Sequence, residues 1–298
     1  MSYIPSKLLE QRLVQFLHED IQYGDVTSEL VPNVPVKAKV ISKQEGILCG
    51  LKFVKILLKS LNVEVSTPFK DGEAIREGDE VLLLHGLSRP ILVTERTILN
   101  LMMRLSGIAT QTRNLVNKVH KSGQKMIIAS TRKTTPGFRY FEKYAVKAGG
   151  GDPHRWNLSD TVLIKENHLK LLKEDAITTL LNQSKEVTSF SKKVDIEVEN
   201  IAELKIALKF SPEIIMLDEF SINDIREAIE IVRTKSKQNP PLIEISGGIT
   251  EQNIEDYFIP GVDIISVGAL THSVQALDFS MKICEVMPFR EGEESIVD

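Results

Sequence analysis

The residues best suited to chemistry lie together between positions 130 and 155, in the stretch STRKTTPGFRYFEKYAVKAGGGDPHR. This stretch carries five lysines and arginines before a histidine–arginine pair, although the chain as a whole has a formal net charge of −4. Arginine forms paired hydrogen bonds to carboxylates and phosphates, and lysine supplies a compact positive charge. Such a concentration of cations around a proline turn and a triple glycine indicates either a solvated basic face or a pocket for a strongly anionic molecule.

Six short apolar runs in the second half of the chain each end in a polar or glycine-containing group. The runs are KMIIAS, TVLIK, KVDIEVE, EIIMLD, PLIEIS and VDIISVG, and they fall between residues 125 and 268. The residues at their ends are Arg132, Lys133, Lys165, Glu197, Asp218, Ser246 and Gly268. Because the carboxyl ends of the strands of a βα barrel open on one mouth, we expect these residues to converge on a single site.

The order of these residue types has a chemical meaning. Cations follow the first two runs, the carboxylates Glu197 and Asp218 belong to the middle two, and glycine turns follow the last two. Glycine turns bind phosphate through bare backbone N–H groups, whereas a carboxylate pair stabilises positive charge or holds a divalent metal ion with its waters. The pattern predicts a substrate with carboxylates, a partner with phosphates, and a cationic transition state.

Each of these residues, taken singly, has a more ordinary interpretation. Arginine and lysine after a strand are commonly solvated, Asp218 can cap the next helix, and turns require glycine. Glu197 and Glu199 lie two apart, as on the polar side of an edge strand, and a lone histidine such as His154 is commonly structural. The arrangement of all of them in chain order favours the functional interpretation. Neither a P-loop nor a dinucleotide-binding glycine motif is present in the sequence.

The elements that must position these residues follow two different patterns. Helical patterns fall between most of the six runs, which predicts βαβ units, a parallel sheet and an open or incomplete βα barrel at residues 108–274. Residues 1–107 mix helix and strand patterns and predict an N-terminal α+β domain, so the fold class is α/β with two domains. The long helical pattern at 91–119 is expected to break at Gly107, and residues 275–298 are expected to cap the barrel or to return to the first domain.

Composition excludes several classes of protein. Only two cysteines occur, Cys49 and Cys284, so a disulfide framework and a cysteine-rich metal site are both excluded. The sequence shows no signal-peptide pattern and no apolar run long enough to span a bilayer, which predicts a cytoplasmic protein without a membrane partner. The mildly acidic balance argues against a nucleic-acid partner, which would need a broad basic surface.

Several motifs occur in order along the chain: HEDIQYGDVTSELV, ERTILNLMMRLSGIAT, TRKTTPGFRYFEKYAVKAGGG, HRWNLSDTVLIKENH, DIEVEN, IIMLDEF and EISGGIT with DIISVGALTHS. With these motifs, nearly the whole chain resembles the quinolinate phosphoribosyltransferase family, the carboxylating nicotinate-nucleotide pyrophosphorylases. The resemblance implies an N-terminal sandwich domain and an open barrel of seven strands. It also implies a homodimer, or a hexamer built from dimers, in which each site borrows residues from a neighbour.

The reaction implied by the resemblance joins quinolinate to phosphoribosyl pyrophosphate with Mg²⁺, giving nicotinate mononucleotide, pyrophosphate and CO₂. The positions that match the family's quinolinate-binding residues are Arg132, His154, Arg155 and Lys165, with Arg96 supplied by the adjacent subunit. Those that match its phosphoribosyl side are Lys133, the ribose- and metal-binding pair Glu197 and Asp218, and the 5′-phosphate cradle of Ser246, Gly247, Gly248 and Gly268. The resemblance implies catalytic roles for Lys133, Lys165, Glu197 and Asp218.

The chain departs from the family pattern at three places. KENH stands where Lys-Asp-Asn-His is common, so that Glu166 keeps the charge of aspartate with a longer reach. LDE replaces Leu-Asp-Asn, so that Glu219 adds a negative charge near the expected metal position. GGGDPHRWN places Asp152 and Pro153 beside the histidine of the expected carboxylate pocket.

Two alternatives remain open at this point. One is an enzyme of the same fold with another substrate, such as nicotinate or the substrate of the molybdenum-operon homologue. A nicotinate site would need fewer cations for its single carboxylate, so STRKTTPG together with HR and IKENH favours a dicarboxylate. The other alternative is a barrel without catalytic activity that binds phosphorylated metabolites.

Overall fold

The computed structural model describes residues 4–172, 175–235 and 239–288. The chain forms two compact units, Met1–Gln111 with Val274–Asp298 and Thr112–Ser273, and the division falls inside helix α3 (Ser88–Lys121). The division predicted from the sequence lies at residue 107, and residues 289–298 of the predicted C-terminal segment lie outside the described ranges. Among the helices of the described ranges, none combines the length and the apolar character needed to cross a membrane.

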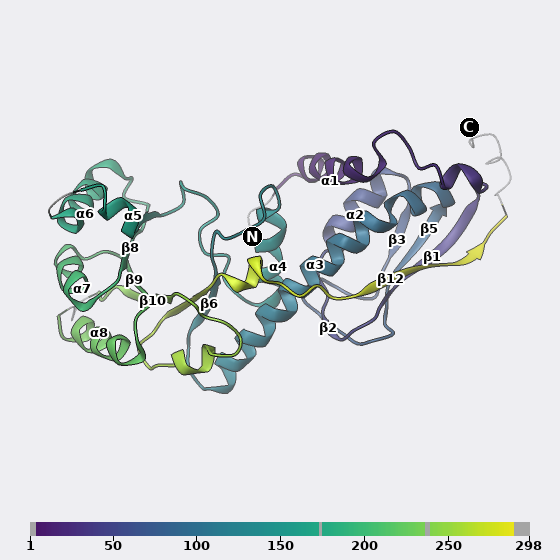
Figure 1. Ribbon diagram of the computed structural model, residues 1–298. Helices are drawn as coiled ribbons and strands as arrows, with labels where there is room; N and C mark the ends of the chain where they lie inside the picture. Colours follow the sequence, from purple (N-terminus) through teal and green to yellow (C-terminus); the bar gives the residue numbers. More distant parts are fainter. Residues whose placement is uncertain (1–3, 173–174, 236–238, 289–298) are drawn as a thin grey trace. The chain divides into compact units, whose positions relative to one another are not determined.

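The first unit contains an antiparallel sheet of four strands in the order β12-β1-β5-β3 and a small two-stranded sheet, β2-β4 (Figure 1). Its elements are α1 (Ser6–Ile21), the 3₁₀ turn η1 (Ser28–Leu30), β1 (Pro35–Ser42), β2 (Gly46–Ile47), α2 (Leu51–Ser60), β3 (Glu64–Ser66), β4 (Ala74–Ile75), β5 (Glu80–Leu87), the first part of α3, and β12 (Phe279–Val286). Strand β12 pairs with β1 from Val36↔Val286 to Ser42↔Phe279. The C-terminal segment therefore returns to the first unit.

Strand β1 shows why these residues form a sheet with one buried face. Val36, Ala38 and Val40 alternate with lysines along PVKAKVIS and are buried, because successive side chains of a strand point to opposite faces. On the other face, Lys37 pairs with Glu285 of β12 at 2.8 Å, and Lys39 pairs with Glu80. These cross-strand pairs fix the register of the strand against its two neighbours.

Helix α3 is continuous, so the break expected at Gly107 does not occur. The glycine serves a different purpose: a Cβ atom at this position would lie 2.2 Å from the carbonyl oxygen of Gln275 and 3.0 Å from the Cα of Ala276. The returning C-terminal segment thus passes directly over the helix backbone. Gly107 is required for this close approach and costs the helix some intrinsic propensity.

The second unit is built on a parallel sheet of six strands in the order β6-β11-β10-β9-β8-β7. Its elements are β6 (Ile127–Ser130), α4 (Arg139–Gly149), β7 (Val162–Ile164), α5 (Glu166–Leu169), α6 (Ala176–Val187), β8 (Val194–Val198), α7 (Ile201–Ala207), η2 (Leu208–Phe210), β9 (Ile214–Asp218), α8 (Ile222–Lys235), β10 (Leu242–Ser246), η3 (Ile254–Tyr257), β11 (Ile264–Val267) and α9 (Ala269–His272). Each strand coincides with one of the six apolar runs, so that prediction is confirmed. Helices α6, α7 and α8 lie side by side along β8, β9 and β10 (Figure 1).

The sheet is open, since β6 and β7 are its two edges in the part of the chain that the structure describes. The resemblance implied seven strands, whereas the described residues form six in this sheet. Beside the edge strand β6 lies an isolated parallel bridge between Ala129 and Asp152. Two backbone hydrogen bonds form this bridge, from the Asp152 N–H to the Ile128 carbonyl at 2.8 Å and from the Ser130 N–H to the Asp152 carbonyl at 2.9 Å. The bridge ties the end of the GGGD turn to the edge strand β6.

The two faces of this sheet differ in polarity because side chains alternate along each strand. One set belongs to the hydrophobic core of the second unit: Ile196, Val198, Ile215, Leu217, Ile243, Ile245, Ile265 and Val267. The alternate set is mostly polar and lies on the opposite face: Asp195, Glu197, Asp218, Glu244, Ser246 and Ser266. The strands are therefore held by the apolar set and present the polar set to the interior of the open barrel.

The passage of the C-terminal segment over α3 leads to a test of stability. Gly107→Ala should lower the free energy of unfolding by about 1–3 kcal/mol, the usual cost of overpacking, although alanine normally stabilises a helix by about 1 kcal/mol over glycine. Urea denaturation followed by circular dichroism measures the change. The matched control is Asn100→Ala at an exposed position of the same helix, which should change stability by less than about 0.5 kcal/mol. An increase in the stability of Gly107→Ala would contradict the close approach.

Candidate active site

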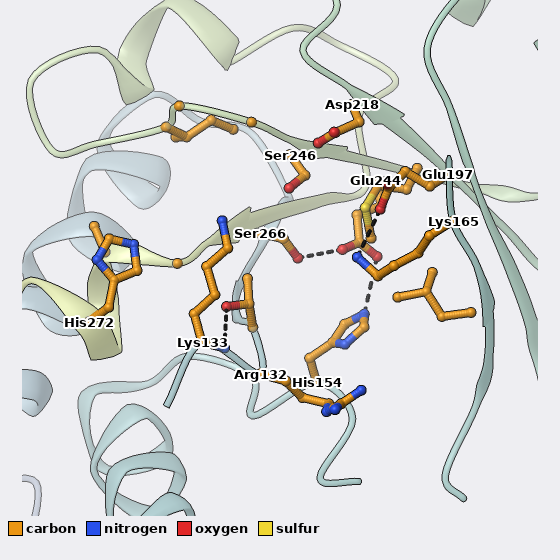
Figure 2. A pocket seen from close by; sticks show the side chains of 18 of the residues that line it. Arg132, Lys133, His154, Lys165, Glu197, Asp218, Glu244, Ser246, Ser266 and His272 are labelled. Atoms are coloured by element: carbon orange, nitrogen blue, oxygen red, sulfur yellow. Dashed lines mark hydrogen bonds and ion pairs between the residues drawn. The ribbon is translucent and has the colours of Figure 1, made fainter. Parts of the chain in front are cut away.

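A cavity of about 540 Å³ lies at the carboxyl ends of the strands of the second unit, a size typical of small-molecule sites (Figure 2). All but one of the predicted site residues line it: Arg132, Lys133, His154, Arg155, Lys165, Glu197, Asp218, Ser246, Gly247, Gly248 and Gly268. They come together because all six strands run parallel, so that their carboxyl ends meet at one edge of the sheet.

Arg96 is the exception among the predicted residues. It belongs to the part of α3 in the first unit, it is exposed, and it does not line the cavity. Within residues 4–172, 175–235 and 239–288 its guanidinium has no hydrogen bond or ion pair. Glu80, a possible surface partner, pairs with Lys39.

Two arginines face the cavity beside each other, and the nearby carboxyl groups of Asp195, Asp160 and Glu244 balance the charge of Arg155 only in part. Arg155 is only 9% exposed, and its pKa is lowered by burial and then by the neighbouring guanidinium of Arg132. Its contact with the Thr161 carbonyl is long, at 3.4 Å. The Nε of Arg132 is buried and has no hydrogen-bond partner among the described residues. Two guanidinium groups held together with an unpaired donor form a receptor for an anion, because an anion would supply both the charge and the acceptors.

The loops that carry these arginines are braced by buried charges on α4. Glu142 is fully buried, and its carboxylate accepts hydrogen bonds from the Thr135 N–H at 3.0 Å and the Thr135 hydroxyl at 2.9 Å. The ammonium of Lys143, also fully buried, donates to the Ser130 hydroxyl at 3.2 Å and to the Pro153 carbonyl. One helix thus holds both the turn that follows Arg132 and the turn that precedes Arg155.

The cations of the stretch at 130–155 therefore divide into two groups. Arg132 and Lys133 line the cavity, whereas Arg139 donates to Thr134 at 3.0 Å and to the Trp156 carbonyl at 3.1 Å. Lys143 braces the loops as described above. Lys147 is exposed in the last turn of α4. The sequence pattern was interpreted as a single anion receptor. In the structure, Arg139 and Lys143 instead hold the loops around the cavity.

His154 adopts a left-handed backbone conformation, with φ of 52°. The Asp152 side chain stabilises it by accepting a hydrogen bond from the His154 N–H at 2.6 Å. The aspartate that departs from the family pattern is therefore an anchor, since its backbone also forms the bridge to β6. This turn directs the imidazole toward Glu244 of β10, with 3.2 Å between Nε2 and Oε2 (Figure 2).

The acidic side of the cavity combines one paired and one free carboxylate. Lys165, which follows β7, pairs with Glu197 of β8 at 3.0 Å. Asp218 ends β9, and its carboxylate has no hydrogen bond or ion pair with any described residue. Carboxylate oxygens are the ligands that Mg²⁺ prefers, and an unpaired carboxylate at the cavity edge fits one that binds a hydrated ion.

The glycine turns after β10 and β11 leave backbone groups bare. Gly247 has φ of 98°, and a Cβ there would lie 2.8 Å from the Glu219 backbone nitrogen, so a larger residue cannot replace it without a shift. A Cβ at Gly268 would lie 3.1 Å from both Lys133 Cδ and His272 Nε2. The turns are thus narrow and bring backbone N–H groups to the cavity surface, as a phosphate cradle requires.

Two acidic departures from the family pattern, Glu166 and Glu219, directly follow the lining residues Lys165 and Asp218. Glu219 is exposed and has φ of 55°, a left-handed conformation that asparagine tolerates better than most residues. Glu166 pairs with Lys170 one turn later on α5. Neither residue is part of the lining.

Three polar residues inside the strands were not predicted from the sequence. Glu244 and Ser266 line the cavity, and Asp195 lies fully buried beside them, with neither carboxylate oxygen hydrogen-bonded to a described residue. Burial raises the pKa of Asp195 well above its usual value, and the Glu244 carboxylate raises it further. The spacing in the sequence could have indicated them, because residues two apart on a strand share one face. Each lies two positions before a predicted site residue: Asp195 before Glu197, Glu244 before Ser246, and Ser266 before Gly268.

The missed carboxylates form a group with His154 that resembles a metal site in spacing. One ligand atom each from His154, Asp195 and Glu244 lies within 4.8 Å of the others. Both Glu244 oxygens are already used, by the Ser266 hydroxyl and by His154, and the positive charge of Arg155 acts on Asp195. A metal cation would have to displace these hydrogen bonds beside an existing positive charge, so hydrogen bonding describes this group better than metal coordination.

The buried ammonium of Lys143 makes stability depend on pH. Burial lowers its pKa from 10.5 to about 8, so between pH 8 and 10.5 the unfolded chain binds more protons than the folded protein. The free energy of unfolding should therefore rise across this window, by at most about 3 kcal/mol. Lys143→Met should remove the rise in urea denaturation at stepped pH, whereas Lys147→Met, at an exposed position of the same helix, should keep it. A Lys143→Met curve parallel to that of the wild type would contradict this.

Comparisons with known proteins agree with this geometry. The family models described as the quinolinate phosphoribosyl transferase N-terminal and C-terminal domains match residues 25–106 and 108–282. The chain is 43% identical over 264 residues, covering 88% of this chain and 99% of the relative, to a probable nicotinate-nucleotide pyrophosphorylase (carboxylating) of Archaeoglobus fulgidus. It is 35% identical over 276 residues, 90% of this chain and 94% of the relative, to the nicotinate-nucleotide pyrophosphorylase (carboxylating) of Mycobacterium leprae.

Solved structures extend the likeness to three dimensions. The nicotinate-nucleotide pyrophosphorylase from Francisella tularensis superposes with a TM-score of 0.87 at 37% identity, covering 95% of this chain and 98% of that one. The likeness includes both units, the open parallel sheet and the cavity-bearing half of the chain. The chain therefore belongs to the quinolinate phosphoribosyl transferase family.

Proposed function

We propose that the protein transfers a phosphoribosyl group from phosphoribosyl pyrophosphate to quinolinate and releases CO₂ and pyrophosphate, forming nicotinate mononucleotide. The single observation that carries this proposal is the pair Arg132 and Arg155, which share one cavity with a buried donor left unpaired. Membership of the family supports it, as do the names of the relatives, nicotinate-nucleotide pyrophosphorylases of the carboxylating kind.

The charge in the cavity favours a dicarboxylate over nicotinate. The guanidinium groups of Arg132 and Arg155 line the cavity together with the His154 imidazole and Lys165. Figure 2 shows Arg132 next to His154. A doubly negative acid gives each arginine a carboxylate partner, whereas a single carboxylate leaves one guanidinium buried without an anion, which costs free energy. The arrangement therefore discriminates by leaving charge unpaired with the wrong substrate.

Ribosyl transfer develops positive charge on the sugar as the bond to pyrophosphate breaks. Glu197 and Asp218, at the ends of adjacent strands, supply fixed negative charge for that oxocarbenium character. Lys133 lies beside the Gly268 turn and supplies positive charge for the leaving pyrophosphate. The turns after β10 and β11 hold the 5′-phosphate, and the arginines orient the ring nitrogen toward the sugar.

Mg²⁺ is the proposed cofactor. Asp218 is the better suited of the two carboxylates to hold it, directly or through water, because Glu197 is already paired with Lys165. When bound, the ion neutralises charge on the pyrophosphate oxygens. The role of the protein residues around it is to hold the sugar and the leaving group in line.

The function is tested by incubation with phosphoribosyl pyrophosphate and Mg²⁺, together with quinolinate or nicotinate. Quinolinate should give nicotinate mononucleotide, pyrophosphate and CO₂ in equal amounts, and nicotinate should give little or no nucleotide. Chromatography of the nucleotides and trapping of CO₂ measure both. Turnover of nicotinate without CO₂ would favour the related enzyme of other specificity, and ligand binding without pyrophosphate release would favour the non-catalytic barrel.

We further propose that the sites are shared between subunits of a homodimer or of a hexamer built from dimers. Arg96 is exposed, has no partner among the described residues, and does not line the cavity of its own second unit. A fourth cation supplied by a neighbouring chain would close the pocket over a doubly charged acid and exclude water.

Subunit mixing tests this sharing. Arg96→Ala and Lys165→Ala should each be nearly inactive alone, because each removes a cation from every site. Reassembled together in equal amounts, they should recover about a quarter of wild-type activity, since about half of random dimers are mixed and each of these has one intact site. Mass spectrometry of differently tagged subunits confirms mixing. No recovery in demonstrably mixed dimers would place Arg96 outside a shared site.

A further inference from the structure

His154 and Glu244 form a pair in the cavity that ribosyl transfer does not use. We propose that His154, oriented by Glu244, is the acid that protonates C2 of the pyridine ring after the carboxylate on that carbon has left as CO₂. This proposal rests on the function proposed above and assigns a residue to the second half of that reaction.

The hydrogen bonds of the pair leave one ring nitrogen for the substrate. The His154 Nε2 lies 3.2 Å from Glu244 Oε2, and the Ser266 hydroxyl donates to the other Glu244 oxygen (Figure 2). The Glu244 side chain is 0% exposed and that of His154 is 14% exposed, so the carboxylate is fixed while the imidazole reaches the cavity. Nδ1 of His154 has no hydrogen-bond partner among the described residues. A buried carboxylate on one nitrogen orients a histidine and stabilises its protonated form.

The arginines, the lysines and the second histidine that line the cavity are less suited to this step. Arginine does not release its proton in proteins, so neither guanidinium qualifies. Lys165 is engaged by Glu197, and Lys133 lies beside the Gly268 turn on the phosphoribosyl side. His272 also lies beside Gly268, and its Nδ1 is 2.6 Å from the Ser273 hydroxyl. Histidine is also the side chain whose ordinary pKa permits proton release near neutral pH.

Titratable and charged groups lie around His154. One ligand atom each of Glu244 and Asp195 lies within 4.8 Å of an imidazole nitrogen, and Arg132, Arg155 and Lys165 belong to the same cavity. A doubly negative acid that binds in this cavity brings its negative charge beside these cations and the imidazole.

The location of the arginines places the reacting carbon near this nitrogen. Arg155 follows His154 in the chain, and Arg132 lies beside it in the cavity (Figure 2). In this proposal one of the two guanidinium groups holds the C2 carboxylate next to the imidazole, and C2 itself lies one bond further on. The group that helps to hold the C2 carboxylate is therefore within reach of C2 once that carboxylate leaves.

The step balances in atoms and electrons. The bond between C2 and the carboxylate carbon breaks, CO₂ leaves without the bonding electrons, and the pair stays on C2 next to the ribosylated, cationic ring nitrogen. The Nδ1–H bond of the imidazolium then breaks as the C2–H bond forms, leaving neutral imidazole. The imidazole regains a proton from solvent or with the next substrate, so one proton is consumed in each turnover.

Single-turnover experiments on His154→Gln separate the two halves of the reaction. Excess enzyme with quinolinate, phosphoribosyl pyrophosphate and Mg²⁺ is quenched at intervals, and pyrophosphate, the carboxylated nucleotide and nicotinate mononucleotide are quantified. Pyrophosphate release should stay within about tenfold of wild type, while nicotinate mononucleotide forms about 10²–10⁴ times more slowly, as for loss of a general acid. The carboxylated nucleotide should accumulate.

Two further variants distinguish proton delivery from positioning. His154→Ala leaves space for added imidazole, which should accelerate the second step without changing pyrophosphate release. Glu244→Gln keeps the shape but removes the charge that supports the imidazolium, and should show the same accumulation to a smaller degree. If His154→Gln slows both steps by one factor, or if imidazole restores both equally, the residue only positions substrate and the proposal is wrong.

The matched control is His120→Gln, at an exposed histidine in the last turn of α3. It should follow wild-type progress curves for both products, and accumulation of the carboxylated nucleotide in this variant would overturn the assignment. The wild-type reaction separates the two proposals. If wild type releases no pyrophosphate with quinolinate, the proposed function fails; if it does and His154→Gln shows no split, only the role of His154 fails.

Discussion

The confinement of two guanidinium groups in one cavity is the constraint on which the rest of the second unit depends. Arg132 and Arg155 repel each other, and burial lowers the pKa of Arg155 because water no longer solvates its charge fully. Such a pair persists only if the surrounding fold holds both side chains in place. The free energy lost in the unliganded protein becomes available when a dicarboxylate binds between them.

The fold meets this constraint with a second layer of buried charges that never reaches the cavity. Glu142 and Lys143, neighbours on α4, hold the Thr135 turn and the Pro153 carbonyl on either side of the arginines. Their carboxylate and ammonium are satisfied by hydrogen bonds, which a buried charge requires. Inside the sheet, Lys165 with Glu197 and His154 with Glu244 follow the same rule. Asp218 remains free, and it is the carboxylate proposed to meet the metal ion.

The strand order brings the two halves of the chemistry together. Strand β6, first along the chain, lies beside β11, the last strand of this sheet, so Lys133 reaches the Gly268 turn. The Thr271 hydroxyl of α9 donates to the Lys133 carbonyl at 2.7 Å and fixes this approach. Along the strand order from β11 to β7, the cavity is lined first by the glycine turns, then by the carboxylates Asp218 and Glu197, and then by Lys165. A molecule with phosphates, a sugar and a ring with two carboxylates can therefore contact suitable groups along its length.

Much of this was determined by the sequence by itself. Six apolar runs with polar ends predicted the parallel sheet and most of the cavity lining, because strands of one direction must deliver their ends to one edge. The ordered motifs identified the family. Asp195, Glu244 and Ser266 lie on the same face of their strands as predicted site residues, because side chains alternate along a strand. Their role was not predicted, because it depends on neighbours on other strands that the sequence does not specify.

The tertiary structure decided which cations of the stretch at 130–155 line the cavity and which hold the surrounding loops in place. Arg139 and Lys143 are long cationic side chains like Arg132, and the sequence does not distinguish their roles. In the folded chain, packing directs Arg132 to the cavity and the other two to hydrogen bonds with the surrounding loops. Gly107 looked like a helix break and proved to be a crossing point, because the segment that passes over it lies more than 160 residues later in the chain. Local sequence specifies what a residue is able to do, whereas distant contacts determine which of these possibilities the folded chain uses.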